Sequence, residues 1–143
     1  RFAIDSICNG KQLAGNVSAL KTNKEVINFV SKTPGAIGII GVNWLSDRND
    51  STGLSFNKEV RVMSVSYSTQ PTVANSFKPY QAYLYYGDYP LRRDIYALVN
   101  DPRNGLCWGF SGFLQSYRGQ LIIQKSGLLP ATQAVRIVDV KDE

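Results

Sequence analysis

The most constraining feature of the sequence is the apolar run Ala36–Val42, which reads AIGIIGV. A strand with one wet face alternates apolar and polar residues, and this run does not alternate. Both faces of such a strand must be covered, as in the parallel sheet of an α/β protein. The segment before the run favours a helix, since Thr22 and Glu25 are spaced as a capping box and Pro34-Gly35 ends the pattern. The sequence therefore predicts an α/β fold, with a mixed, mostly parallel sheet and helices on both faces.

Further segments extend this prediction. Glu59–Ser68 (EVRVMSVSYS) alternates and suits an extended strand or an interdomain crossover. Leu91–Val99 and Ala134–Val140 are also predicted to be strands. Gly105–Ser126 is predicted to be one long helix that Gly127 ends, because apolar residues recur along it at intervals of three and four. The side chains expected in the core are Ile37, Ile39, Ile40, Phe110, Phe113, Leu114, Tyr117 and Leu121.

Composition excludes several classes of protein. The 143 residues suffice for one domain with a proper core, and 43% hydrophobic with 19% charged residues is typical of a globular chain. No run of 18 apolar residues occurs, so no membrane-spanning helix is expected. The sequence has no histidine, which excludes Ser-His-Asp and Cys-His nucleophilic systems and zinc sites that need imidazole. Neither GxGxxG nor GxxxxGK[ST] is present, so nucleotide binding has no motif, and no cofactor is expected.

The net charge of +5 does not indicate a nucleic-acid partner. The basic residues are scattered, and the tightest pair is Arg92-Arg93. No basic arm or aromatic-rich RNA-binding signature surrounds them. The two cysteines, Cys8 and Cys107, lie among apolar neighbours and are expected to be buried free thiols, with a single disulfide as the alternative.

A catalytic pair of carboxylates is the hypothesis from a different class. Asp88 and Asp94 would then have to converge in a pocket and have raised pKa values. The aspartates of the chain fall in turn-like contexts such as SDRND, YGDYP and VNDPRNG, where aspartate is favoured for turn geometry. The chain is therefore not expected to be an enzyme.

Three segments in order resemble the later half of phosphate-binding proteins of the PstS type, the solute-binding components of ABC importers. The first is TNKEVINFVSKTPGAIGIIGVNWL, similar to a helix, turn and buried strand of that family. The second is YPLRRDIYALVN, similar to a later strand. The third is GFLQSYRGQLIIQKSGLLPA, similar to the C-terminal helix, with a Gly-Gln pair before an apolar run and a Gly-x-x-Pro ending.

This resemblance implies a two-lobed, hinged binding protein with lobes of the type II periplasmic-binding-protein kind. Residues 1–66 would be part of the second lobe, and residues 67–143 the crossover and the returning C-terminal part of the first. The implied function is binding of inorganic phosphate for an ABC membrane permease, in the periplasm or elsewhere outside the cytoplasm, with a lipid anchor as one possibility. Alternatives within the same fold are a sensory or adhesion domain, or a receptor for another oxyanion such as molybdate or sulfate.

The resemblance also implies a ligand site between the lobes. Gly41 and Asn43, at the end of the apolar strand, would line its wall, and Arg1 would lie near the anion. The family's Ser-Gly-Thr-like anion loop is absent, and the chain begins with RFAIDSIC, so we expect a fragment or a processed product. A lobe without its partner strands would expose apolar surface, and self-association of the fragment is the corresponding expectation.

Overall fold

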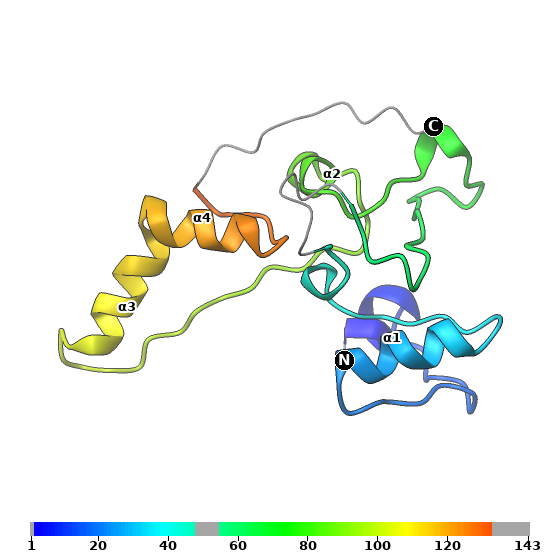
Figure 1. The fold of residues 1–143 in the computed structure, drawn as a ribbon, viewed down its shortest axis with the longest axis horizontal. Helices are drawn as coiled ribbons and strands as arrows, with labels where there is room; N and C mark the ends of the chain where they lie inside the picture. Colours follow the sequence, from blue (N-terminus) through cyan, green and yellow to red (C-terminus); the bar gives the residue numbers. More distant parts are fainter. Residues whose placement is uncertain (1, 48–54, 133–143) are drawn as a thin grey trace. The chain divides into compact units, whose positions relative to one another are not determined.

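The computed structural model describes residues 2–47 and 55–132 of the chain (Figure 1). It comprises two compact units, Arg1–Met63 and Ser64–Glu143. The elements of the first unit are η1 (Ala3–Ile7), α1 (Asn23–Lys32) and η2 (Val42–Trp44), and those of the second are η3 (Val73–Asn75), α2 (Gln81–Tyr86), α3 (Leu106–Gln115) and α4 (Tyr117–Lys125).

Local signals place the start and end of α1 as predicted. The backbone N–H of Glu25 donates to Oγ1 of Thr22 at 3.2 Å, which makes Thr22 the N-cap. The Glu25 carboxylate accepts from the backbone N–H of Lys21 at 3.1 Å, one residue before the partner that a capping box has. After α1, Gly35 has φ +80°, a left-handed conformation in which a side chain would be strained. The helix is therefore terminated by the Pro34-Gly35 turn, as the sequence indicates.

The apolar run after α1 is not a buried strand, and this part of the prediction is wrong. Ala36–Gly41 lies as an extended segment along α1, and Gly38 approaches the helix so closely that a Cβ there would meet Val26 and Val30 at 2.8 and 2.9 Å. Ile37 and Ile39, both expected in the core, are 74% and 55% exposed. Only one face of the segment is thus covered, because no second layer lies on the other face within the described residues.

The predicted α/β fold with a mixed, mostly parallel sheet is contradicted throughout the described part of the chain, whose regular secondary structure is almost all helical and which contains no sheet. Its β pairing consists of two isolated antiparallel bridges, Ser46–Phe56 and Val65–Phe77. Of the predicted strands, Glu59–Ser68 contributes only the Val65 bridge and Leu91–Val99 has no β partner, while Ala134–Val140 lies outside the described residues. Each strand of a parallel sheet pairs with a strand that is distant in sequence. An apolar sequence pattern predicts that a segment is buried, but it does not identify the strand that pairs with it.

The expected long helix is two helices that meet at a corner at Ser116 (Figure 1). Ser116 has an extended backbone (φ −68°, ψ 161°), and its Oγ accepts from the N–H of Gly119 at 3.3 Å, so it is the N-cap of α4. Its hydroxyl also donates to the carbonyl oxygen of Phe113 at 2.6 Å. A serine that satisfies backbone groups on both sides can end one helix and start the next. The spacing of apolar residues alone does not indicate such a break.

Glycine inside a helix costs stability relative to alanine, so the sequence predicts that Gly109, Gly112 and Gly119 pack closely against another backbone. Gly119 confirms this, since a Cβ there would overlap the Phe113 carbonyl and lie 2.8 Å from the Leu114 Cα. Gly109 and Gly112 do not, because nothing lies within 4 Å of a Cβ built on either. The close packing is thus confined to the corner between α3 and α4.

Two glutamine side chains fix the ends of α4. Gln120 is only 5% exposed; its Nε2 donates to the Leu114 carbonyl at 2.7 Å, and its Oε1 accepts from the N–H groups of Ala131 and Thr132 at 2.7 and 3.2 Å. Gln81, at the start of α2, donates through Nε2 to the carbonyls of Gln124 and Leu128 at 3.0 and 2.9 Å. The Gln124 carbonyl lies in the last turn of α4 and the Leu128 carbonyl lies just beyond the helix, so a side chain distant in sequence satisfies acceptors where α4 ends.

Most apolar side chains expected in a core are not buried. Among the described residues, Ile27 on α1 is the one large hydrophobic side chain classed as buried. Phe110 and Phe113 on α3 are 60% and 42% exposed, so the predicted burial of the helix stripe is wrong. The two cysteines are free, but Cys107 is exposed and Cys8 half-buried, contrary to the expected burial.

Replacing Gly119 with alanine should destabilise the second unit by about 1–3 kcal/mol, because the added methyl would overlap backbone atoms that cannot move aside cheaply. Gly112→Ala is the matched control: it adds the same methyl to open space in a helix and should stabilise α3 by roughly 0.5–1 kcal/mol. Denaturant unfolding followed by far-ultraviolet circular dichroism measures both. Equal effects of the two substitutions would contradict the described corner.

Candidate functional site

Two of the three predicted ligand-binding residues, Gly41 and Asn43, lie in the same turn at the end of the apolar run. Gly41 is the N-cap of η2, and its carbonyl accepts from the N–H of Trp44 at 3.1 Å. The turn continues with the N–H of Leu45 donating to the Val42 carbonyl at 2.9 Å. Arg1, the third predicted residue, lies outside the described residues, so its place near this turn stays a prediction.

A short antiparallel contact holds this turn in place. Ser46 and Phe56 form an isolated bridge, and the N–H of Asn57 donates to the Leu45 carbonyl at 2.6 Å. The hydroxyl of Ser46 also donates to the Val42 carbonyl at 3.3 Å. The turn is therefore fixed from both sides by backbone hydrogen bonds.

The side chain of Asn43 folds back over Gly41. Its Oδ1 lies 2.7 Å from the position that a Cβ of residue 41 would occupy, so a side chain at that position would displace the Asn43 amide. Asn43 is half-buried, and its amide has no hydrogen-bond partner within the described part of the chain. An amide offers two N–H donors and one acceptor. The turn thus presents free hydrogen-bond donors that could bind an anion.

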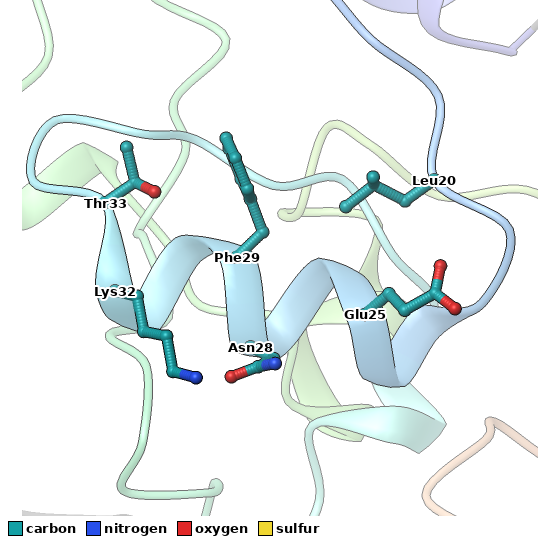
Figure 2. A pocket seen from close by; sticks show the side chains of 6 residues that line it. All are labelled: Leu20, Glu25, Asn28, Phe29, Lys32 and Thr33. Atoms are coloured by element: carbon teal, nitrogen blue, oxygen red, sulfur yellow. The ribbon is translucent and has the colours of Figure 1, made fainter.

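A hollow of about 370 Å³ lies on the surface of α1 (Figure 2). Figure 2 shows Phe29 between Leu20 and Thr33, with Asn28 and Lys32 at the other edge. No sequence motif indicates this hollow, because it forms only where the segment before α1 folds beside the helix. The residues that line it are Leu20, Glu25, Asn28, Phe29, Lys32 and Thr33.

The hollow has neither the enclosure nor the charge of an anion site. Leu20 and Phe29 remain 40% and 49% exposed, so a bound molecule would keep much of its hydration. Its two charged residues, Glu25 and Lys32, have opposite signs, and the Glu25 carboxylate is already bound to the N–H of Lys21. The hollow therefore favours no charged ligand class.

Asn75 organises the loop before α2. Its Oδ1 accepts from the N–H of Thr72 at 2.7 Å and the hydroxyl of Ser66 at 3.1 Å, and its Nδ2 donates to the Gln70 carbonyl at 3.2 Å. The role of Asn75 was not predicted from the sequence, although Thr72 and Asn75 have the spacing of a capping box. Because its oxygen and its nitrogen are both engaged, Asn75 stabilises the loop and leaves little for a ligand.

Aromatic side chains gather around α2. The rings of Phe77 and Tyr83 lie 4.9 Å apart, and those of Tyr80 and Tyr83 lie 6.2 Å apart. Partial burial raises the pKa of Tyr89 above its ordinary value of 10.0. These contacts supply the apolar packing of α2, which is too short to be stable alone.

The carboxylates considered for catalysis do not form a reactive pair in what the structure shows. Asp94 accepts a hydrogen bond from the phenol of Tyr96 at 3.2 Å, on an exposed segment. Asp88 lies in the turn after α2, where its backbone N–H donates to the Tyr83 carbonyl. Among the described residues, no group of three or more Cys, Asp or Glu side chains could hold a metal ion.

Comparison with known proteins assigns the family. A family model described as "PBP superfamily domain" matches residues 4–118. The chain belongs to this family. The PBP superfamily domain is of the periplasmic solute-binding kind, and the matched residues include Gly41 and Asn43.

Several family properties follow from this membership. PBP superfamily domains bind and transport solutes and are generally not enzymes. They generally deliver ligands to ABC permeases, and they are usually extracytoplasmic. The membership supports the prediction of a phosphate-binding-protein-like family, but it does not identify the chain as a protein of the PstS type.

No curated protein and no solved structure matches the chain. In the part that the structure describes, no helix has the length and apolar character needed to cross a membrane.

Replacing Asp94 with asparagine should lower the pKa of Tyr96. That pKa is raised above 10.0, first by the hydrogen bond to Asp94 and then by its negative charge. The pKa of Tyr96 is higher in the folded chain than in the unfolded chain. Its hydrogen bond to Asp94 therefore stabilises the fold below pH 10, and this stabilisation is lost as the pH rises through the pKa of Tyr96 in the folded chain. NMR titration of the Tyr96 ring measures the shift, and Asp88→Asn is the control that should leave it unchanged. An unaltered Tyr96 pKa in Asp94→Asn would rule out the contact.

Proposed function

We propose that this PBP superfamily domain is part of an extracytoplasmic receptor that binds inorganic phosphate and delivers it to an ABC permease. The family match over residues 4–118 supports the solute-binding role. The choice of phosphate rests on the resemblance of three segments to PstS-type proteins, of which the TNKEVINFVSKTPGAIGIIGVNWL segment contains the candidate turn.

The observation that carries the proposal is the free amide of Asn43. Its side chain lies over Gly41 and has no hydrogen-bond partner among the described residues. Its N–H groups can donate to a phosphate oxygen, and a hydrogen bond to a charged group contributes about 1.5–3 kcal/mol. Arg1 belongs to the same proposal: a guanidinium can give two charge-assisted hydrogen bonds to a tetrahedral oxyanion.

The two lobes remain part of this proposal. Residues 1–66 would belong to the second lobe and residues 67–143 to the crossover and the returning part of the first. The ligand would lie between the lobes, with the turn at Gly41–Asn43 on the wall of the cleft. A phosphate ion in this turn alone would keep much of its water, so chain 1–143 should bind it weakly.

Replacing Asn43 with alanine in the intact protein should weaken phosphate binding about 10- to 100-fold, the equivalent of one hydrogen bond to an anion. Isothermal titration calorimetry with inorganic phosphate measures this, with sulfate and molybdate titrated in parallel. Asn28→Ala is the control: it removes an exposed amide from the α1 hollow and should not change the affinity.

Tight binding of sulfate or molybdate with no binding of phosphate would refute the choice of ligand. An undiminished phosphate affinity in Asn43→Ala would refute the site while leaving the receptor role standing. Tight phosphate binding by chain 1–143 alone would refute the proposed cleft between two lobes.

A further inference from the structure

Two asparagines of the chain are followed directly by a glycine, in the pairs Asn9-Gly10 and Asn104-Gly105. In such a pair the backbone nitrogen of the glycine can attack the side-chain amide carbon of the asparagine, because glycine has no Cβ to crowd that nitrogen. Both asparagines are exposed, so water reaches both amides. The two pairs are alike in sequence, and they differ in how the structure holds the N–H of the glycine.

The first pair lies where η1 ends, and its glycine N–H is part of that ending. The N–H of Gly10 donates to the Ile4 carbonyl at 2.9 Å, back across the end of η1. Asn9 and Gly10 both have a left-handed backbone, with φ 50° and 78°. The Gly10 nitrogen can attack only after this hydrogen bond has broken and the turn has opened, so the fold should protect Asn9.

The second pair lies in a loop directly before α3. The N–H of Gly105 donates to the carbonyl of Arg103, two residues back, at 2.8 Å, which is a local contact of the γ-turn type. Breaking this contact releases no helix hydrogen bond, since Gly105 is the N-cap of α3 and takes part in the helix through its carbonyl, which accepts from the N–H of Gly109 at 3.1 Å. The side-chain amide of Asn104 has no hydrogen-bond partner within the described residues. Both reacting groups are therefore available without the opening of a helix.

We infer that Asn104 is a site of spontaneous deamidation. The Gly105 nitrogen forms a bond to Cγ of Asn104 and loses its proton to water, and the side-chain nitrogen of Asn104 leaves as ammonia. Water then opens the resulting five-membered imide at one of its two carbonyls, which gives aspartate or isoaspartate at position 104. The reaction needs no co-reactant except water and transfers no electron. This inference does not rest on the proposed function.

The modification would act on the start of α3. Gly105, the N-cap, has no side chain to bond the first turn, and that turn contains no acidic residue. Negative charge near the N-terminus of a helix is favourable, so the aspartate product should support α3. The isoaspartate product adds a carbon to the backbone between residues 104 and 105 and should displace the N-cap.

The test is incubation of chain 1–143 at mildly alkaline pH, followed by digestion at mildly acidic pH, where deamidation is slow, and mass spectrometry of the peptides. In the folded chain, Asn104 should convert about three- to tenfold faster than Asn9, the factor that corresponds to one net hydrogen bond. In the chain unfolded by guanidinium chloride, the two sites should convert at rates within about twofold of each other, because both pairs then have the same freedom.

Gly105→Ala is the matched variant. Alanine fits at this position, since the nearest atom to its Cβ would be Oδ2 of Asp101 at 4.0 Å. The Cβ crowds the attacking nitrogen and should slow conversion at Asn104 about tenfold, folded or unfolded, with Asn9 unchanged. A folded chain in which the two sites convert equally fast, or in which Asn9 converts faster, would overturn the inference, as would an unchanged rate at Asn104 in Gly105→Ala.

Discussion

The side-chain amide of Gln120 is the interaction on which the architecture of the second unit most depends. It is the one buried polar side chain among the described residues, and it joins the end of α3, at the Leu114 carbonyl, to the backbone amides of Ala131 and Thr132. A buried amide without such partners would cost about 1–3 kcal/mol, so its burial and its hydrogen bonds require each other. Gly119 makes the arrangement possible, because the corner leaves no room for a Cβ.

This gives a physical meaning to the motif that suggested the family. In the structure the Gly-Gln pair lies at the corner between two helices. Gly119 allows the backbone of α4 to approach that of α3, and Gln120 links this corner to the chain after α4. These residues determine the geometry of the corner between α3 and α4. The candidate ligand groups, Gly41 and Asn43, lie in the other unit, in a turn that follows an extended apolar segment.

Local features were predictable from the sequence, and long-range ones were not. The Thr22 cap and the left-handed glycines at 35 and 127 follow from groups within a few residues, and the structure has all three. The apolar runs predicted burial but could not name what covers them, so Ile37 and Ile39 were wrongly placed in a core. The corner at Ser116 was missed because apolar periodicity continues across it. For the site, the sequence could indicate Asn43 only through the resemblance, since the folding of its side chain over Gly41 is a matter of conformation.

Native-state hydrogen exchange, resolved by residue, tests most directly whether the described chain is held by helix ends and side-chain amides instead of a sheet. We expect slow exchange at the amides of Ala131 and Thr132, which donate to Gln120, and along α4. The amides of residues 37–40 have no hydrogen-bond partner among the described residues and should exchange rapidly. Slow exchange at residues 37–40, with fast exchange at Ala131 and Thr132, would show that the apolar run is paired in a sheet and would contradict this account.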